Sequence, residues 1–148
     1  MRGRFRTAAL PAALAALACA GGAGAPAPAP PTAAHPALAE MGGEVFQSSC
    51  ASCHGVRGRG DGPVAPALHP PPADLTRIAA RRGGRFPDGE IARFIDGRFE
   101  LPAHGTRAMP VWGARFGEVV PEAGLSEEIA RGKIASLVEY LKSIQERE

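Results

Sequence analysis

The stretch that decides the fold is Cys50-Ala51-Ser52-Cys53-His54, in which two residues separate a pair of cysteines and a histidine follows the second. Such a pair occurs in thioredoxin-like redox sites, in structural zinc sites and at points of covalent haem attachment. The first needs a βαβ context, and the sequence has no alternating strand pattern. The second needs another ligand pair, and the remaining cysteine, Cys19, lies near the N-terminus. The motif therefore predicts one covalently bound haem c.

The spacing suits this chemistry because two thiols can add to the two vinyl groups along one haem edge. The adjoining helical turn would then bring the imidazole of His54 under the iron as its proximal ligand. Cys50 and Cys53 are thus the expected attachment points, and His54 is the expected metal ligand.

The N-terminus reads as a secretory signal. Arg2, Arg4 and Arg6 precede an apolar run over residues 7–18 that has no polar face. The run is too short for a membrane-spanning helix, which needs about 20 apolar residues. Cleavage after Ala20 would release a free periplasmic protein, whereas lipidation of Cys19 would tether the chain to a membrane. Both alternatives stay open, and export to the periplasm is expected in either case.

Composition divides the rest of the chain into a linker and a domain. Residues 21–38 are nearly all Gly, Ala and Pro and predict an extended linker, which leaves 39–148 as the folded domain. Loss of the three signal arginines leaves 14 basic residues against 15 acidic ones, a net charge of −1. This balance does not favour nucleic acid as a partner.

Helical signals account for the whole domain, so the predicted fold class is all-α. One helix is expected from Leu38 to about Ser49, with Met41, Val45 and Phe46 on one face, and another over Asp88–Asp96, burying Ile91, Phe94 and Ile95. A long helix is expected to begin at Ser126 as N-cap, and a shorter one to follow Asp74 and end at Gly83-Gly84. The apolar stripe of the long helix is formed by Ile129, Ile134, Leu137, Val138, Leu141 and Ile144.

Around the cysteine motif the domain resembles the class I cytochromes c, over almost its whole length. Gly43-Glu-Val-Phe46 looks like the family's Gly-x-x-aromatic face on the first helix, and Tyr140 like the aromatic that this face meets on the last helix. Gly62-Pro63 is similar to the family's Gly-Pro, whose carbonyl holds the proximal imidazole. A ligating histidine needs such an acceptor to fix its tautomer, so Pro63 is expected to serve His54.

The resemblance also implies a second axial ligand. Met109 lies in Gly105-Thr-Arg-Ala-Met-Pro-Val-Trp112, which resembles the family's Met-Pro loop, and a thioether opposite histidine raises the haem potential. His69 and His104 are the alternative ligands. Arg57, Arg59 and Trp112 are candidates to donate to the haem propionates, against the alternatives of solvated surface for the arginines and core for the tryptophan.

With both axial positions filled, iron has no open site for a substrate. The chain is therefore expected to be an electron carrier rather than an enzyme. Its expected partners are redox proteins such as a quinol–cytochrome c reductase, a terminal oxidase or a periplasmic dehydrogenase. Two alternatives remain: a haem c subunit of a larger membrane respiratory complex or dehydrogenase, and a ligand-binding haem protein.

Overall fold

The computed structural model describes residues 33–98, 109–118 and 123–146. The predicted signal, Cys19, most of the predicted linker and His104 lie outside these residues. Every regular element in the described part is helical, as predicted. The α-helices are α1 (Pro36–Ser49), α2 (Ala51–His54), α3 (Asp88–Asp96), α4 (Trp112–Gly117) and α5 (Ala123–Ser143), and the 3₁₀-helices are η1 (Ala65–Ala67), η2 (Leu75–Arg77) and η3 (Ala80–Arg82).

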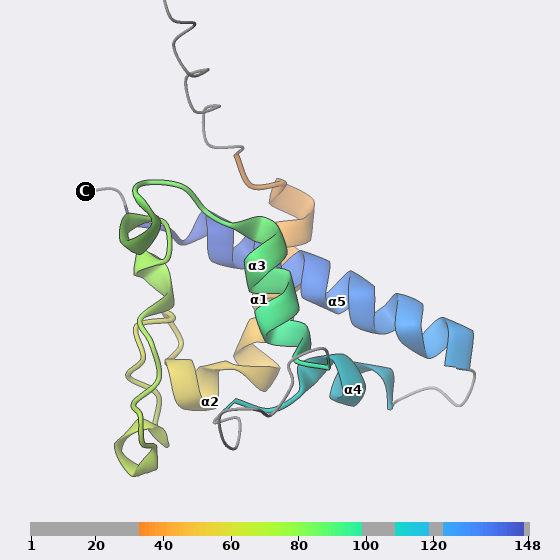
Figure 1. Cartoon of the computed structure of the whole chain (residues 1–148), viewed down its shortest axis with the longest axis horizontal. Coiled ribbons are helices and arrows are strands. Elements are labelled where there is room, and N and C mark those ends of the chain that lie inside the picture. The colour runs from red at the N-terminus through yellow and green to blue at the C-terminus, as the bar shows by residue number, and fades with distance from the viewer. Residues whose placement is uncertain (1–32, 99–108, 119–122, 147–148) are drawn as a thin grey trace, which may run out of the picture.

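The core is built where the first and last helices cross (Figure 1). Phe46 of α1 and Leu137 of α5 are almost wholly buried there. The Phe46 ring lies 5.0 Å from the Tyr140 ring at 40°, a tilted pair that adds to the gain from burial. The predicted meeting of these two aromatics is confirmed.

The glycine that permits this crossing is Gly42, not the predicted Gly43. A Cβ on Gly42 would overlap the Ser136 carbonyl oxygen and lie 2.9 Å from Tyr140 Cβ, whereas one on Gly43 would make an ordinary 3.4 Å contact with the Tyr140 ring. Gly42 stands one full turn before Phe46, so both lie on the same face of α1. The sequence contains two adjacent glycines, and only their contacts with α5 decide between them.

The predicted bounds of α3 are confirmed. Asp88 and Glu90 lie in its first turn, where their negative charges interact favourably with the helix dipole. Gly97 ends the helix in the left-handed conformation with φ +68°. The predicted burial is only partly right, since Ile95 is buried but Phe94 is 53 % exposed. Met41 on α1 is likewise 58 % exposed, because α1 turns its Gly42–Phe46 face toward α5.

Three other helices differ from expectation at their ends or in their type. The short helix after Asp74 is a pair of separate 3₁₀ turns, although Asp74 caps the first by accepting from the Thr76 amide at 2.9 Å and left-handed Gly83 ends the second. Helix α5 begins at Ala123, so Ser126 lies inside it rather than at its N-cap. Gly117 of α4 lies against Ser126, so α4 contacts α5 directly after this additional first turn. Helix α1 begins at Pro36, within the predicted linker, since proline is favoured at a first helical position.

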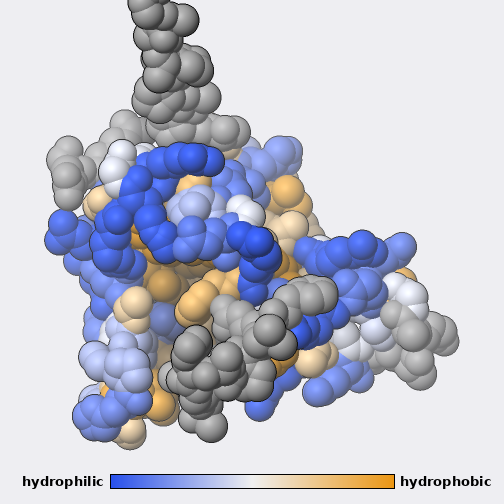
Figure 2. All heavy atoms as spheres, in the orientation of Figure 1, coloured by the Kyte–Doolittle hydropathy of each residue, from blue (hydrophilic) through white to orange (hydrophobic). Residues whose placement is uncertain are grey.

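None of the helices in the described part of the chain has the length and apolar character needed to cross a membrane. Figure 2 shows apolar residues gathered in the middle of one face, bordered by a largely polar surface. Large exposed apolar patches on soluble domains usually mark binding surfaces. The face seen in Figure 2 is therefore a candidate site for an apolar ligand or partner.

Candidate functional site

The two cysteines and His54 are held on one short helical turn. Cys50 ends α1 and begins α2, and its carbonyl accepts from the amides of Cys53 at 3.1 Å and His54 at 2.9 Å. Both cysteines are free thiols of intermediate burial. The turn therefore presents the two cysteine sulfurs and an imidazole together, which is the arrangement the motif predicts.

The loop after α2 folds back and satisfies the carbonyls at the end of the helix. The amides of Gly60, Gly62 and Val64 donate to the carbonyls of His54 (2.8 Å), Cys53 (3.2 Å) and Ser52 (3.1 Å). A Cβ on Gly62 would overlap the Ser52 carbonyl oxygen and lie 2.6 Å from the Cys53 carbonyl carbon. Glycine is needed at this close approach, and the capping fixes the end of α2 that carries His54.

The His54 ring is oriented by a backbone carbonyl. Nδ1 lies 3.1 Å from the Ala73 carbonyl oxygen. Because a carbonyl can only accept, Nδ1 must carry the proton, which leaves the lone pair of Nε2 available to a metal. This is the second contact that metal-ligating histidines normally make.

The acceptor in the structure is Ala73, whereas Pro63 was the predicted one. The Gly62 amide, just before Pro63, is bound to Cys53, so this turn packs over α2. The Pro-rich segment instead brings Ala73 to the ring, because Gly60 lies directly against the Pro72 carbonyl and the Leu75 amide donates to Gly58 at 2.6 Å. A backbone carbonyl has no side-chain signature, and so nothing in the sequence distinguished Ala73.

Local electrostatics favours neutral groups at this site. Burial, and after it the neighbouring Cys53, raises the pKa of the Cys50 thiol to about 12. Burial also lowers the pKa of His54, although the bond to Ala73 acts in the opposite direction. A protonated Cys50 is unlike the low-pKa thiolate of a thiol redox enzyme, and a neutral imidazole is the form that binds metal.

Met109 and Trp112 are partly buried and pack against the same hydrophobic core as Cys50. Trp112 begins α4, stacks on Phe116 with ring centres 5.3 Å apart, and carries the Arg115 guanidinium 5.8 Å from its ring centre. The packing of Trp112 matches the core alternative. The fold therefore brings Met109, the predicted second axial ligand, and the turn over residues 50–54, here called the attachment turn, to one hydrophobic core.

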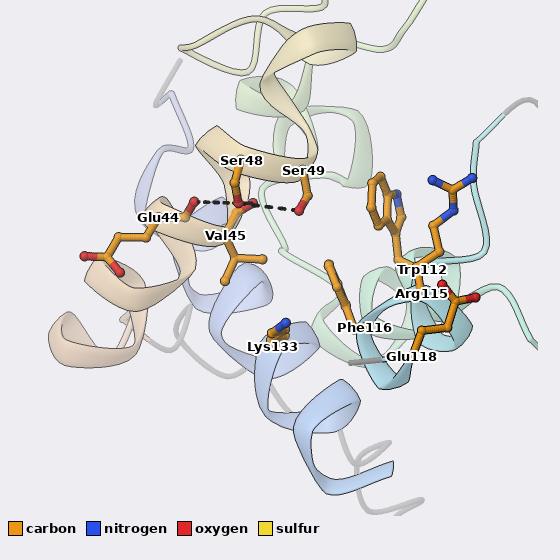
Figure 3. Close-up of a pocket in the computed structure, with 9 residues that line it drawn as sticks. All are labelled: Glu44, Val45, Ser48, Ser49, Trp112, Arg115, Phe116, Glu118 and Lys133. Atoms are coloured by element: carbon orange, nitrogen blue, oxygen red, sulfur yellow. Dashed lines mark hydrogen bonds between the residues drawn. The ribbon is translucent and has the colours of Figure 1, made fainter. Parts of the chain in front are cut away.

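A hollow of about 550 Å³ opens beside the attachment turn (Figure 3). Trp112 and Phe116 of α4 line it from one side and Val45 and Ser49 of α1 from another. Its remaining lining residues are Glu44, Ser48, Arg115, Glu118 and Lys133. The hollow is therefore a mixed polar and aromatic surface next to Cys50 rather than an apolar interior.

The remaining candidates lie at the surface. Arg57 is exposed, and Arg59 is paired with Glu146 near the end of the chain. His69 is exposed in the Pro-rich segment. Among the residues that the structure describes, no group of three or more His, Cys, Asp or Glu side chains is placed to hold a metal ion, so Cys50, Cys53 and His54 do not complete a zinc cluster.

The donor set fits haem. Two cysteine sulfurs on one turn, an imidazole with an available Nε2 and a thioether on a shared core are the groups used for covalent attachment and axial ligation of haem iron. The fold and this turn thus define an all-α haem protein.

The sequence matches the Cytochrome c family model over residues 39–145. The chain belongs to the cytochrome c family, and it carries a covalently bound haem c with iron and serves haem-based electron transfer. Over 88 residues it is 38 % identical to the cbb3-type cytochrome c oxidase subunit FixPc of Rhizobium leguminosarum bv. viciae. That match covers 59 % of this chain and 25 % of the relative, so the chain spans about a quarter of the length of the relative. No solved structure matches it.

Proposed function

We propose that this chain transfers electrons in the periplasm through one haem c attached to Cys50 and Cys53 and ligated by His54 and Met109. The observation that carries the proposal is the turn at α2, where Cys50 and Cys53, which form no disulfide, adjoin a histidine whose Nδ1 is held by the Ala73 carbonyl. When bound, the haem supplies an iron that gains and loses one electron. The chain attaches it, orients the proximal imidazole and fills the distal position with a neutral sulfur.

Met109 decides between an electron carrier and a ligand-binding haem protein. A bound thioether closes the sixth position and stabilises ferrous iron more than a second imidazole does. We expect the purified protein to be six-coordinate and low-spin, to show a thioether–iron charge-transfer band in the ferric state, and to resist carbon monoxide.

The variant Met109→Ala should lose the charge-transfer band and bind carbon monoxide, while Met109→His should remain six-coordinate at a lower potential. Met41→Ala is a matched control, because Met41 is largely exposed on α1 and should leave the band unchanged. A high-spin ferrous wild type would favour the ligand-binding alternative, whereas a band that survives in Met109→Ala would show that Met109 is not the sulfur ligand.

A second candidate is that the chain works as the haem c subunit of a larger respiratory complex. The similarity to an oxidase subunit supports it, since that relative is named as part of a cbb3-type cytochrome c oxidase. The proposed Pro-rich linker would suit a tethered domain. In the alternative of a free carrier, the donors and acceptors are a quinol–cytochrome c reductase, a terminal oxidase or a periplasmic dehydrogenase.

Fractionation of the native host tests both location and complex membership. A free carrier should appear in the periplasmic extract as a monomer. A lipidated Cys19 should move the protein to the detergent phase, and Cys19→Ala should return it to the extract. Co-purification of oxidase subunits at constant stoichiometry would support the complex, whereas retention in the cytoplasm would contradict export.

A further inference from the structure

Arg98, two residues after the end of α3, contacts groups of three helices. The Arg98 guanidinium binds Asp96 through Nε to Oδ1 and Nη2 to Oδ2, both at 2.7 Å. It also binds Glu127 of α5 through Nη1 to Oε2 at 2.5 Å and Nη2 to Oε1 at 3.2 Å. Each carboxylate therefore accepts two bonds from one rigid group, the strongest geometry available to an arginine.

The cluster holds a buried, negatively charged carboxylate at the C-terminal end of α3, where a negative charge is unfavourable. Asp96 is the last residue of α3 and is buried, so its carboxylate faces the negative end of the helix dipole and has lost most of its hydration. The paired guanidinium compensates for both costs. Such a departure from local preference is expected where a residue serves the tertiary structure or the site.

Helix α4 packs against the same Asp96–Arg98 ion pair. Gly113, the second residue of α4, is buried, and a Cβ on it would overlap Asp96 Oδ1 and Arg98 Nε and lie 2.7 Å from Asp96 Cγ. The main chain of α4 thus lies directly against Asp96 and Arg98. Met109 stands four residues before Gly113, and Trp112 between them is fixed by its stack on Phe116.

We propose that the Asp96–Arg98–Glu127 cluster positions Met109 for the haem iron by fixing the start of α4 against α3 and α5. This inference rests on the proposed function, in which Met109 is the distal ligand. Arg98 does not touch the iron; it is a positioning residue that acts through Gly113 and the four-residue connection to the sulfur. A neutral thioether is a weak ligand, so its hold on iron depends on how firmly the protein places it.

The test compares exogenous ligand binding in ferric holoprotein variants. Imidazole must displace Met109, so its affinity reports how well the sulfur is held. We expect Arg98→Ala to bind imidazole about tenfold more tightly, which corresponds to about 1.4 kcal/mol, and to have a lower reduction potential and a weaker thioether–iron band. Arg98→Lys should be intermediate, because lysine keeps the charge but loses the paired bonds.

Two further variants separate positioning from charge. Gly113→Ala keeps all three charges but drives a Cβ into the ion pair, and it should change imidazole affinity in the same direction as Arg98→Ala. Arg131→Ala is the matched control, since Arg131 is an exposed arginine 4.0 Å from the same Glu127 and should leave affinity, band and potential at wild-type values.

The outcomes distinguish this inference from the proposed function. If wild type lacks the thioether–iron band, Met109 is not the ligand and both fail. If wild type has the band, but Arg98→Ala and Gly113→Ala lower only the unfolding midpoint and keep wild-type affinity and potential, the cluster is merely structural and the inference is overturned. Should Arg98→Ala yield no holoprotein, Arg98→Lys and Gly113→Ala decide by the same measurements.

Discussion

The crossing of α1 and α5 gives a direct test of how closely the two helices approach. In Gly42→Ala the new methyl group would overlap the Ser136 carbonyl oxygen and lie 2.9 Å from Tyr140 Cβ, and neither is the movable end of a long side chain. The helices must therefore move apart, which costs about 3 kcal/mol, the upper end of the usual range for an overpacked core, because neither atom can give way alone. Alanine recovers about 1 kcal/mol of helix propensity. We expect a net loss of about 2 kcal/mol in the free energy of unfolding.

The assay is denaturant unfolding of the holoprotein, followed by helical circular dichroism, with two matched glycine variants. A Cβ on Gly43 would make only a 3.4 Å contact with Tyr140, so Gly43→Ala should change stability by less than about 1 kcal/mol. Gly132→Ala lies on the exposed side of α5 with nothing within 4 Å and should be stabilising by about 1 kcal/mol. If Gly42→Ala is no less stable than Gly43→Ala, the close approach at Gly42 is wrong.

Three further outcomes follow from the site and its surroundings. Replacing Cys50 and Cys53 together with Ala should abolish stable holoprotein, because the haem would lose both covalent anchors; haem that leaves wild type in acidified organic solvent would contradict covalent attachment. Burial alone would raise the pKa of Asp74, but its bonds from the Thr76 hydroxyl and amide, together with the charges of Arg59 and Arg81, outweigh that effect and lower the pKa. The stabilisation by this cap is therefore present above the unfolded pKa of about 3.9 and is lost as the pH falls through the folded value. The free energies of unfolding of wild type and Asp74→Ala, measured in urea, should differ by about 1 kcal/mol at neutral pH, and this difference should shrink in acid. A difference that persists at low pH would refute the cap. Electron transfer should depend only modestly on salt, since the chain has two lysines and the structure pairs Lys142 with Asp88 and Glu139; a rate that collapses across moderate ionic strength would show otherwise.

Part of the fold could be predicted from the chain alone because the signals are local. Helical periodicity and end signals predicted the bounds of α3, and the apolar stripe predicted the buried face of α5. The spacing of Cys50, Cys53 and His54 predicts a site because all three residues lie on one turn. Interactions within about four residues do not need the rest of the fold.

The errors lie where distant segments meet. Phe94 and Met41 have suitable spacing for burial, yet they are largely exposed because the faces that α1 and α3 turn inward depend on α5. Helix α5 begins one turn before the expected Ser126, and α4 and Arg98 contact it at Ser126 and Glu127. Local propensity is a weak signal wherever such contacts add stability.

By itself the sequence determined the class of fold, the attachment turn and the nature of its ligand groups, because residue type and short spacing carry that information. Only the tertiary structure decided which carbonyl accepts the bond from His54, which glycine lets α5 approach α1 closely, and which ion pair packs against α4. Ala73, Gly42 and Arg98 each act across long stretches of chain, through a backbone carbonyl, a missing Cβ and a pair of carboxylates. Such contacts are set by the packing of helices, which no short stretch of sequence contains.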